Sequence, residues 1–172
     1  MTHATDPVAR ARARLDAAGV QYQLVEHDPA YTAADEAAAA GRDLPETAKT
    51  LVLVDRDQFE LAVIPASRRL DLARARRVLG ASRHLRLATE EETAERFGQF
   101  EVGALPPFAA DAVPEVIDTR LLYHDTVLCA AGDHRHSVVL DPRELFRLAE
   151  PRVADICEHD ASDHRFSDVP RI

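Results

Sequence analysis

The stretch Glu46-Thr47-Ala48-Lys49-Thr50-Leu51-Val52-Leu53-Val54 is the most informative part of this sequence. Its apolar, partly β-branched run predicts a buried strand that begins directly after a lysine. That residue, Lys49, is the single lysine among the 21 basic residues of the chain. An ammonium is a compact point charge and a guanidinium is a planar fork, so the two are not interchangeable in a site. Lys49 is therefore a candidate functional residue, and a chance surface charge at the start of a strand is the alternative.

The strand that follows Lys49 is expected to pair with the next one. Residues 55–58 have the composition of a turn, and residues 59–65 return as a second apolar strand. A connection this short makes the two strands antiparallel neighbours. Because both are almost continuously apolar, we expect them at the centre of a sheet that is covered on both faces.

The other predicted elements surround this pair. Capping residues and prolines at helix starts predict helices over 6–18, 33–40, 71–79, 89–97 and 142–149. Short apolar runs predict strands over 20–26, 84–87, 115–118, 126–131 and 137–140. Hairpins mixed with crossovers predict an α+β (mixed α/β) fold, a single domain with a mixed, mostly antiparallel sheet flanked by helices.

The end of the chain differs from the rest in composition. From Glu150 onward it is polar, with scattered Asp and His residues and little periodicity. We therefore expect a domain over residues 1–150 and a polar C-terminal tail over 151–172, poorly ordered or draped on the surface.

Composition limits the location and the partners of the protein. No apolar run approaches the roughly 20 residues of a membrane span, and the N-terminal residues lack the apolar core of a signal peptide. Cys129 and Cys157 form no CxxC motif, so no disulfide framework is expected. A cytoplasmic protein without membrane contact is the expectation.

Charge opposes indiscriminate binding of nucleic acid. The net charge is −9, whereas such binding depends on neutralising phosphates. One local basic cluster exists, made of Arg68, Arg69, Arg74, Arg76, Arg77, Arg83 and Arg86. The cluster is either a solvated helix face or a footprint for a phosphate backbone.

A glycine-proline loop is a second candidate feature. In Gly103-Ala104-Leu105-Pro106-Pro107, the glycine permits close approach of a ligand to the backbone. The two prolines stiffen the loop, as binding of an oxyanion or a carbonyl would need. A plain connecting loop is the alternative.

Histidines supply the remaining candidates. His134 and His136 could share one face of a strand, but no third metal ligand has convincing spacing, so no metal or other cofactor is expected. A polar histidine in a pocket, followed by Ser137, is the favoured interpretation. His27 and Thr32 could place an imidazole and a hydroxyl at a helix start, although capping alone explains Thr32.

Several common catalytic motifs are absent. The sequence contains no GxSxG, GxxxxGK[ST], HExxH or GxGxxG. Cys129 lies in an apolar run and is expected to be a small core residue. A covalent hydrolase is therefore disfavoured.

Five segments carry a family resemblance when they are taken together. They are His27-Asp28-Pro29-Ala30-Tyr31-Thr32 before an Ala-rich helix, Thr47-Ala48-Lys49-Thr50-Leu51-Val52-Leu53, Phe59 to Pro65, Glu101-Val102-Gly103-Ala104-Leu105-Pro106-Pro107-Phe108, and Ala131-Gly132-Asp133-His134 with Ser137-Val138. In this order, over about residues 5–150, they resemble the YbaK/prolyl-tRNA synthetase-associated editing domain family.

The resemblance implies a mixed sheet flanked by helices and hydrolysis of the ester bond of mischarged aminoacyl-tRNA. It implies that Lys49 contacts the terminal adenosine and that the loop from Gly103 to Pro107 positions the aminoacyl carbonyl. Water would be activated with help from the ribose hydroxyl of the substrate, without a protein nucleophile. The expected catalytic residues are Lys49, Gly103 and Pro107, and the expected substrate contacts are His27, Thr32, Leu105, Pro106, Phe108, His134 and Ser137.

Selectivity would come from exclusion by size. A pocket lined by residues such as Leu105 and Phe108 would admit small side chains and reject larger ones. We expect a trans-acting deacylase, with tRNA and an aminoacyl-tRNA synthetase as partners, that is a monomer or a weak homodimer. A non-catalytic module that binds tRNA, a nucleotide or a synthetase is the main alternative, and a metal-dependent hydrolase using His134 and His136 is a weaker one.

Overall fold

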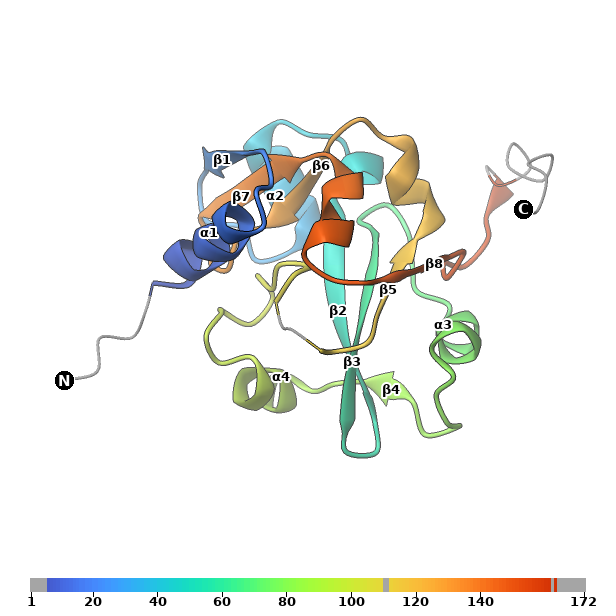
Figure 1. Cartoon of the computed structure of the whole chain (residues 1–172). Helices are drawn as coiled ribbons and strands as arrows, with labels where there is room; N and C mark the ends of the chain where they lie inside the picture. The colour runs from blue at the N-terminus through green and yellow to red at the C-terminus, as the bar shows by residue number, and fades with distance from the viewer. Residues whose placement is uncertain (1–5, 110–111, 162, 164–172) are drawn as a thin grey trace.

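The structure is a computed structural model that describes residues 6–109, 112–161 and 163. Its helices are α1 (Pro7–Ala17), α2 (Ala33–Ala40), α3 (Leu72–Leu79) and α4 (Glu90–Arg96), with 3₁₀ helices η1 (Leu44–Glu46), η2 (Thr119–Tyr123) and η3 (Pro142–Arg147). Its strands are β1 (Tyr22–Glu26), β2 (Ala48–Asp55), β3 (Gln58–Pro65), β4 (Arg86–Leu87), β5 (Glu115–Asp118), β6 (Val127–Ala130), β7 (His136–Leu140) and β8 (Arg152–Ala154). Figure 1 shows these elements in one α+β domain, which confirms the predicted fold class.

The strands form two sheets around the predicted central hairpin. One sheet has the order β4-β2-β3-β5-β8, and the other has the order β1-β7-β6. The β2–β3, β2–β4, β1–β7 and β6–β7 pairs are antiparallel, whereas β3–β5 and β5–β8 are parallel. The expected mixture of mostly antiparallel and some parallel pairing is therefore present, but it is divided between two sheets where the sequence predicted one.

A parallel bridge between Thr47 and Leu128 joins the two sheets at the start of β2. Side chains along a strand alternate between the two faces of the sheet, so each face can pack against a separate core. The larger core cluster includes Val52 of β2, Cys129 of β6 and Leu15 of α1. The smaller cluster lies on the other face, where Leu53 of β2 meets α3.

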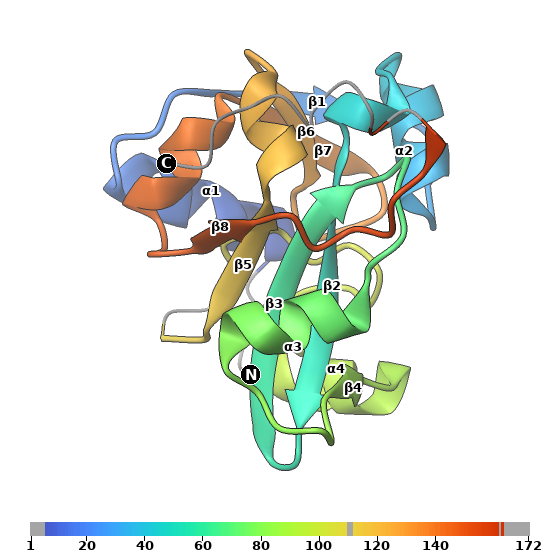
Figure 2. The same ribbon diagram turned by 90° about the vertical axis from the view of Figure 1, so that its right-hand side faces the viewer.

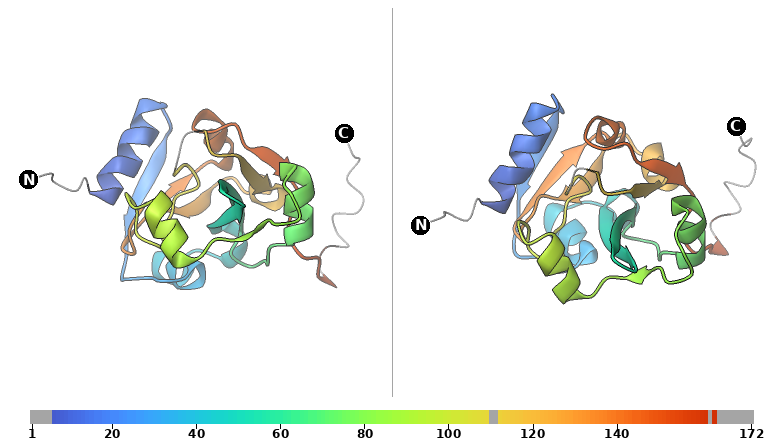
Figure 3. Two further views of the ribbon diagram at one scale, coloured as in Figure 1. Left: turned by 90° about the horizontal axis from the view of Figure 1, so that it is seen from below. Right: turned by 60° about the horizontal axis from the view of Figure 1, so that its bottom comes forward.

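Helices cover the joined sheets from both sides. Figure 3 shows α1 and α2 on opposite sides of the strands β1 and β7. In Figure 2, α2 and α3 lie at different heights along the molecule, and β2 begins near α2. The start of β2, where Lys49 is the second residue, therefore lies toward α2.

Local sequence explains where the helices begin. Thr32 caps α2 by accepting a hydrogen bond from the Asp35 backbone N–H, and Asp71 does the same for α3 with the Arg74 N–H. Thr89 and Glu92 form the expected capping box of α4. The last predicted helix differs, because Pro142–Arg147 is a 3₁₀ helix and does not continue as an α-helix.

The predicted C-terminal tail is wrong for its first part. Residues 152–154 form β8, which pairs with β5. Ile156 and Cys157 then bury their side chains in the smaller core cluster, and Asp118 accepts a hydrogen bond from the Ile156 N–H. This burial and pairing outweigh the polar composition of the segment. Residues 162 and 164–172 lie outside the described residues.

Charged pairs fix the segment that follows β8. Arg120 donates to Asp155 at 2.9 Å and to Asp163 at 3.0 Å, and Arg68 donates to Asp163 at 2.8 Å. These carboxylates lower the exposure of both guanidinium groups and hold the chain against η2. Residues 155–161 and 163 are therefore part of the folded domain.

One buried carboxyl lies within the sheet without a full set of partners. Glu115 in β5 is buried, and its Oε1 has no hydrogen-bond partner among the described residues. Burial raises the pKa of Glu115 to about 8, and Arg14 opposes this only in part. Glu115 is consequently expected to keep its proton at neutral pH.

We predict that Glu115 makes the protein less stable as pH rises from about 4.5 to about 8. In this window the folded protein holds the Glu115 proton and the unfolded chain has released it, so the free energy of unfolding falls with pH. The slope from one such group is at most about 1.4 kcal/mol per pH unit. Urea unfolding at several pH values should show a flatter dependence for Glu115→Gln than for wild type. Equal slopes for the two proteins would contradict the prediction, and exposed Glu95→Gln serves as the control.

Candidate functional site

Lys49 is half-buried near the beginning of β2, opposite Ile64 of β3. Opposed residues of antiparallel strands share a face, and Ile64 belongs to the smaller core cluster. Lys49 therefore projects from the face opposite the larger core. Burial lowers the pKa of Lys49, Cys157 opposes this shift, and Arg69 adds to it. Within the described residues, no carboxylate forms an ion pair with Lys49, so its charge is available to a ligand.

The strand register places Lys49 on the same face as Ser137. Thr47 is bridged to Leu128, so Lys49 and Ala130 each lie two residues farther along their strands, and Ala130 pairs with Ser137. Neighbouring strands are about 4.8 Å apart, so the backbones at Lys49 and Ser137 are about 10 Å apart. The small, partly exposed Ala130 lies between them.

A buried hydrogen-bond network lies at the Ser137 end of this row. The Ser137 hydroxyl donates to Oε1 of Glu36 in α2 at 2.5 Å, and His27 Nε2 lies 2.8 Å from the same hydroxyl. His27 Nδ1 lies 2.7 Å from the backbone oxygen of Asp28. A carbonyl oxygen only accepts, so Nδ1 carries a proton. The network thus ties α2 to β7 and to the end of β1.

The network can hold one proton in either of two arrangements. If Glu36 is ionised, Ser137 donates to it and His27 Nε2 donates to Ser137. If Glu36 is protonated, both bonds reverse and His27 is neutral. Burial raises the pKa of Glu36, whereas the Ser137 hydrogen bond and the charges of His27 and His134 lower it. The total charge of the network is zero in both arrangements.

Gly103 and His134 form a rim beside this network. Gly103 is exposed with a φ of 86°, and a Cβ built on it would lie 3.5 Å from His134 Cε1 and 3.6 Å from the Tyr31 oxygen. His134 is held by contact of its Nδ1 with the Ala30 oxygen at 3.0 Å and by the Tyr31 ring at 4.8 Å. A hollow of about 360 Å³ lies here, lined by Pro29, Tyr31, Glu101, Val102, Asp133, His134 and Arg135.

The other predicted loop residues lie below the surface. Leu105 and Phe108 are packed in the larger core, and Pro106 and Pro107 are also buried. The expectation that Leu105 and Phe108 line an open pocket is therefore not met in this structure. Their side chains face the larger core, whereas Lys49 projects from the opposite face of the sheet.

The remaining predicted site residues have structural partners. The Thr32 hydroxyl accepts the capping hydrogen bond of α2. His136 turns toward Asp133, whose carboxylate lies 2.9 Å from its Nδ1, so it does not converge with His134. Across the described ranges, no group of three or more His, Cys, Asp or Glu residues is placed to hold a metal ion.

The arginine cluster is partly neutralised by acidic neighbours. Arg68 pairs with Asp163, Arg74 with Asp155, and Arg86 with Glu92. Such pairing reduces the positive field that a phosphate backbone would meet. The helices of the described part of the chain include none long and apolar enough to cross a bilayer.

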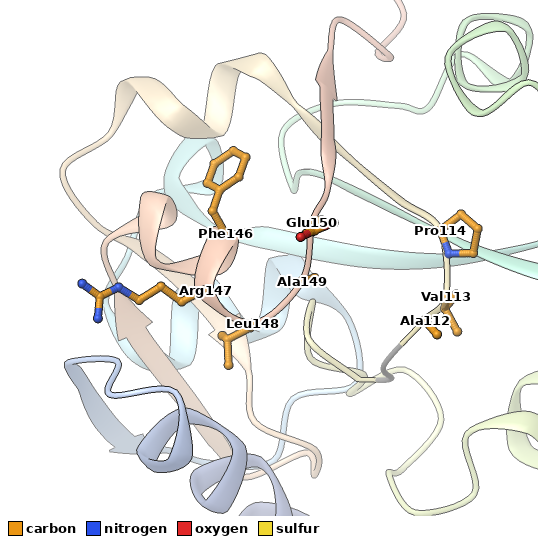
Figure 4. Close-up of a pocket in the computed structure, with 8 residues that line it drawn as sticks. All are labelled: Ala112, Val113, Pro114, Phe146, Arg147, Leu148, Ala149 and Glu150. Atoms are coloured by element: carbon orange, nitrogen blue, oxygen red, sulfur yellow. The ribbon is translucent and has the colours of Figure 1, made fainter.

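Another hollow of the structure lies elsewhere. Figure 4 shows a hollow of about 500 Å³ between residues 112–114 and the end of η3. Arg14 of α1 donates to the Leu148 oxygen beside it, so the hollow is on the α1 side of the molecule. Lys49 projects from the other face, and the lining of the hollow contains none of the predicted site residues.

Sequence reasoning missed Glu36 and Tyr31. Glu36 lies in an Ala-rich helix, where a carboxylate is normally solvated, yet it is only 8% exposed. Glu36 and Ala37 are the two residues that α2 buries. Glu36 therefore lies on the buried side of the helix, next to an alanine.

Comparisons with known proteins match most of the chain. A family model described as "Aminoacyl-tRNA editing domain" matches residues 27–148, which include Lys49, Gly103 and the buried network. The prolyl-tRNA editing protein ProX of Acetoanaerobium sticklandii is 27% identical over 145 residues, covering 80% of this chain and 87% of that protein. The proline–tRNA ligase of Shouchella clausii is 34% identical over 100 residues, covering 58% of this chain but 17% of the ligase.

A solved structure extends the similarity to the whole fold. A crystal structure of a protein proposed to be a trans-editing enzyme for prolyl-tRNA synthetase has a TM-score of 0.80 and 32% identity. The similarity covers 90% of this chain and 99% of that one.

We predict that Ser137→Ala destabilises the protein by about 1 to 3 kcal/mol. The substitution leaves buried Glu36 and His27 without their shared hydroxyl, and unsatisfied buried polar groups cost about that much. Urea unfolding of this variant and of Ser67→Ala, which removes an exposed hydroxyl, measures the difference. A Ser137→Ala protein as stable as Ser67→Ala would contradict the role of the network.

Proposed function

The chain belongs to the aminoacyl-tRNA editing domain family, and on this premise we propose that it hydrolyses mischarged aminoacyl-tRNA that carries a small amino acid. The observation that carries the proposal is the row of Lys49, Ala130 and Ser137 on one face of the sheet. This row has a cation at one end and a buried polar network at the other. An aminoacyl ester on a terminal adenosine has matching polar groups at its two ends.

Lys49 would hold the nucleotide end of the substrate. Its ammonium is without a carboxylate partner and half-buried, so it can form charge-assisted hydrogen bonds with a phosphate or a ribose hydroxyl. Arg69 lies close enough to lower the pKa of Lys49, which concentrates positive charge at this end. Lys49 would bind and position the substrate without acting as a nucleophile.

Gly103 would let the aminoacyl carbonyl approach the backbone. The residue is exposed and has no Cβ, so a ligand can reach the main chain between His134 and the Tyr31 oxygen. Fixed backbone amides near a developing oxyanion stabilise the transition state by about 3 kcal/mol per donor in well-studied enzymes. Pro106 and Pro107, both buried, would hold this loop rigid.

The protein side chains near the row do not supply a free nucleophile. The Ser137 hydroxyl is fully buried between Glu36 and His27. Cys129 and Cys157 are also buried, and burial raises the pKa of both thiols. Attack by water, aided by the substrate itself, is therefore the step that this site supports.

The proposed selectivity for small substrates is an exclusion by size around the centre of the row. Ala130, which lies between the cation and the network, has a short side chain and is partly exposed. Exclusion of large side chains from this space is the basis of editing by size. We further propose that the protein acts in the cytoplasm on the 3′ end of tRNA, alone or with a synthetase.

The activity can be tested with a panel of tRNAs mischarged with small amino acids such as alanine or serine. We expect the protein to release one of them well above the rate in buffer. Release from no member of the panel would overturn the proposal.

We predict that Lys49→Ala lowers kcat/KM for this release by at least about 100-fold with little change in melting temperature. Loss of a charge-assisted contact of about 3 kcal/mol has that effect on a rate. Lys49→Arg keeps the charge but replaces the compact ammonium, and we expect it to recover only a small part of the activity. Full activity in Lys49→Ala would show that the wrong residue was assigned.

We predict that Gly103→Ala loses most of the activity, whereas Gly41→Ala keeps it. Both glycines have positive φ, of 86° and 67°, so each alanine should cost about 1 kcal/mol of stability. Gly41 ends α2 with nothing within 4 Å of a built Cβ, whereas Gly103 lies at the rim of the site. Activity assays and unfolding curves on both variants separate the two effects, and equal activities would count against the loop.

A further inference from the structure

Glu36 is a buried carboxylate with one oxygen that remains without a partner. Its Oε1 accepts the short hydrogen bond from Ser137. Within the described residues, no hydrogen bond reaches Oε2, and this oxygen is not among the fully enclosed side-chain atoms. Oε2 is therefore not enclosed, and it belongs to a carboxylate that Ser137 holds on the face it shares with Lys49.

This oxygen is held in place by its surroundings. Glu36 is 8% exposed, follows the capped first turn of α2 and is fixed by Ser137, which is itself fixed by His27. A carboxylate that is already positioned loses little entropy when it binds a partner. When Glu36 is ionised, the cationic His27 reaches it only through Ser137, so a cationic ligand in direct contact with Oε2 would stabilise the buried carboxylate further.

We infer that Glu36 binds the protonated α-amino group of the aminoacyl ester, which makes this site specific for substrates with a free amine. The inference rests on the proposed function and adds to it the class of substrate. An aminoacyl ester carries its ammonium one carbon from the carbonyl, on the side away from the ribose. With the nucleotide end at Lys49, the ammonium would extend across Ala130 toward Glu36.

The charges around Glu36 fit this assignment. His27 and His134 are the groups whose charges act on it, and Lys49 lies on the same face about 10 Å from Ser137. If Glu36 is protonated, an arriving ammonium would favour its ionised form, and the proton would pass through Ser137 to His27 Nε2. No proton then has to leave the network.

Other carboxylates nearby are less suited to this role. Glu101 is at the rim, with a side chain that is 50% exposed, and it already accepts from the His134 N–H. Asp35 is exposed at the start of α2. Water screens an exposed carboxylate, so neither would select an ammonium as strongly as Glu36.

The inference can be tested by binding without turnover. The probe is 3′-deoxy-3′-(L-alanylamino)adenosine, whose amide replaces the ester, and its N-acetylated form lacks the ammonium. We expect calorimetry to show that wild type prefers the free amine by at least about tenfold, the effect of one charge-assisted hydrogen bond. In Glu36→Gln, which keeps an acceptor for Ser137 but removes the charge, the preference should fall close to one.

Asp35→Asn removes a neighbouring exposed charge and should leave the preference unchanged. A preference that survives in Glu36→Gln, or a wild type that does not favour the free amine, would overturn the inference. If Glu36→Gln weakens both probes equally, Glu36 has only a structural role. Because the probes are not hydrolysed, a wild-type preference for the free amine that disappears in Glu36→Gln, together with a negative tRNA panel, would refute the deacylase and retain the ammonium site.

Discussion

The parallel bridge between Thr47 and Leu128 is the contact on which the site depends. It joins two sheets that otherwise have separate strand orders. Because of this junction, a cation from β2 and a hydroxyl from β7 project from one continuous face, with Ala130 between them. A shift of one residue at the junction would turn Lys49 into the larger core. The position of the site is thus a consequence of strand register.

The two ends of the row differ in how their charges are stabilised. Lys49 is partly desolvated and lacks a carboxylate partner within the described residues, so a ligand with negative charge can compensate it. Glu36 is more deeply buried and depends on Ser137 and His27. Opposite charges that are separated by a small residue suit a ligand with an anionic and a cationic end. If Lys49 and Glu36 formed a direct ion pair, a ligand would gain less binding free energy from contacting them.

Much of the fold could be predicted because local signals and tertiary packing agree. The apolar runs gave β2 and β3, and the caps Asp6, Thr32, Asp71 and Thr89 mark the starts of the four α-helices. The three residues of β8 could not be found by periodicity, since only pairing with β5 makes them a strand. The final helix was expected to be α-helical, but Pro142–Arg147 forms 3₁₀ turns.

The candidate site could be predicted only in part for a similar reason. Lys49, Gly103, His27, His134 and Ser137 were identified from the sequence, and the structure places all except Lys49 in contacts with one another or with shared neighbours. Glu36 was missed because its role depends on a partner 101 residues away in sequence. Leu105 and Phe108 were expected in the pocket because apolar loop residues can line one, but the core accommodates them.

A crystal structure with a non-hydrolysable aminoacyl-adenosine amide bound tests most directly whether this face is the functional site. The geometry predicts that the ligand lies across Ala130, with its nucleotide end at Lys49 and its amine at Glu36. A ligand bound instead in the hollow beside Phe146 and Leu148, on the α1 side, would contradict the assignment of the site.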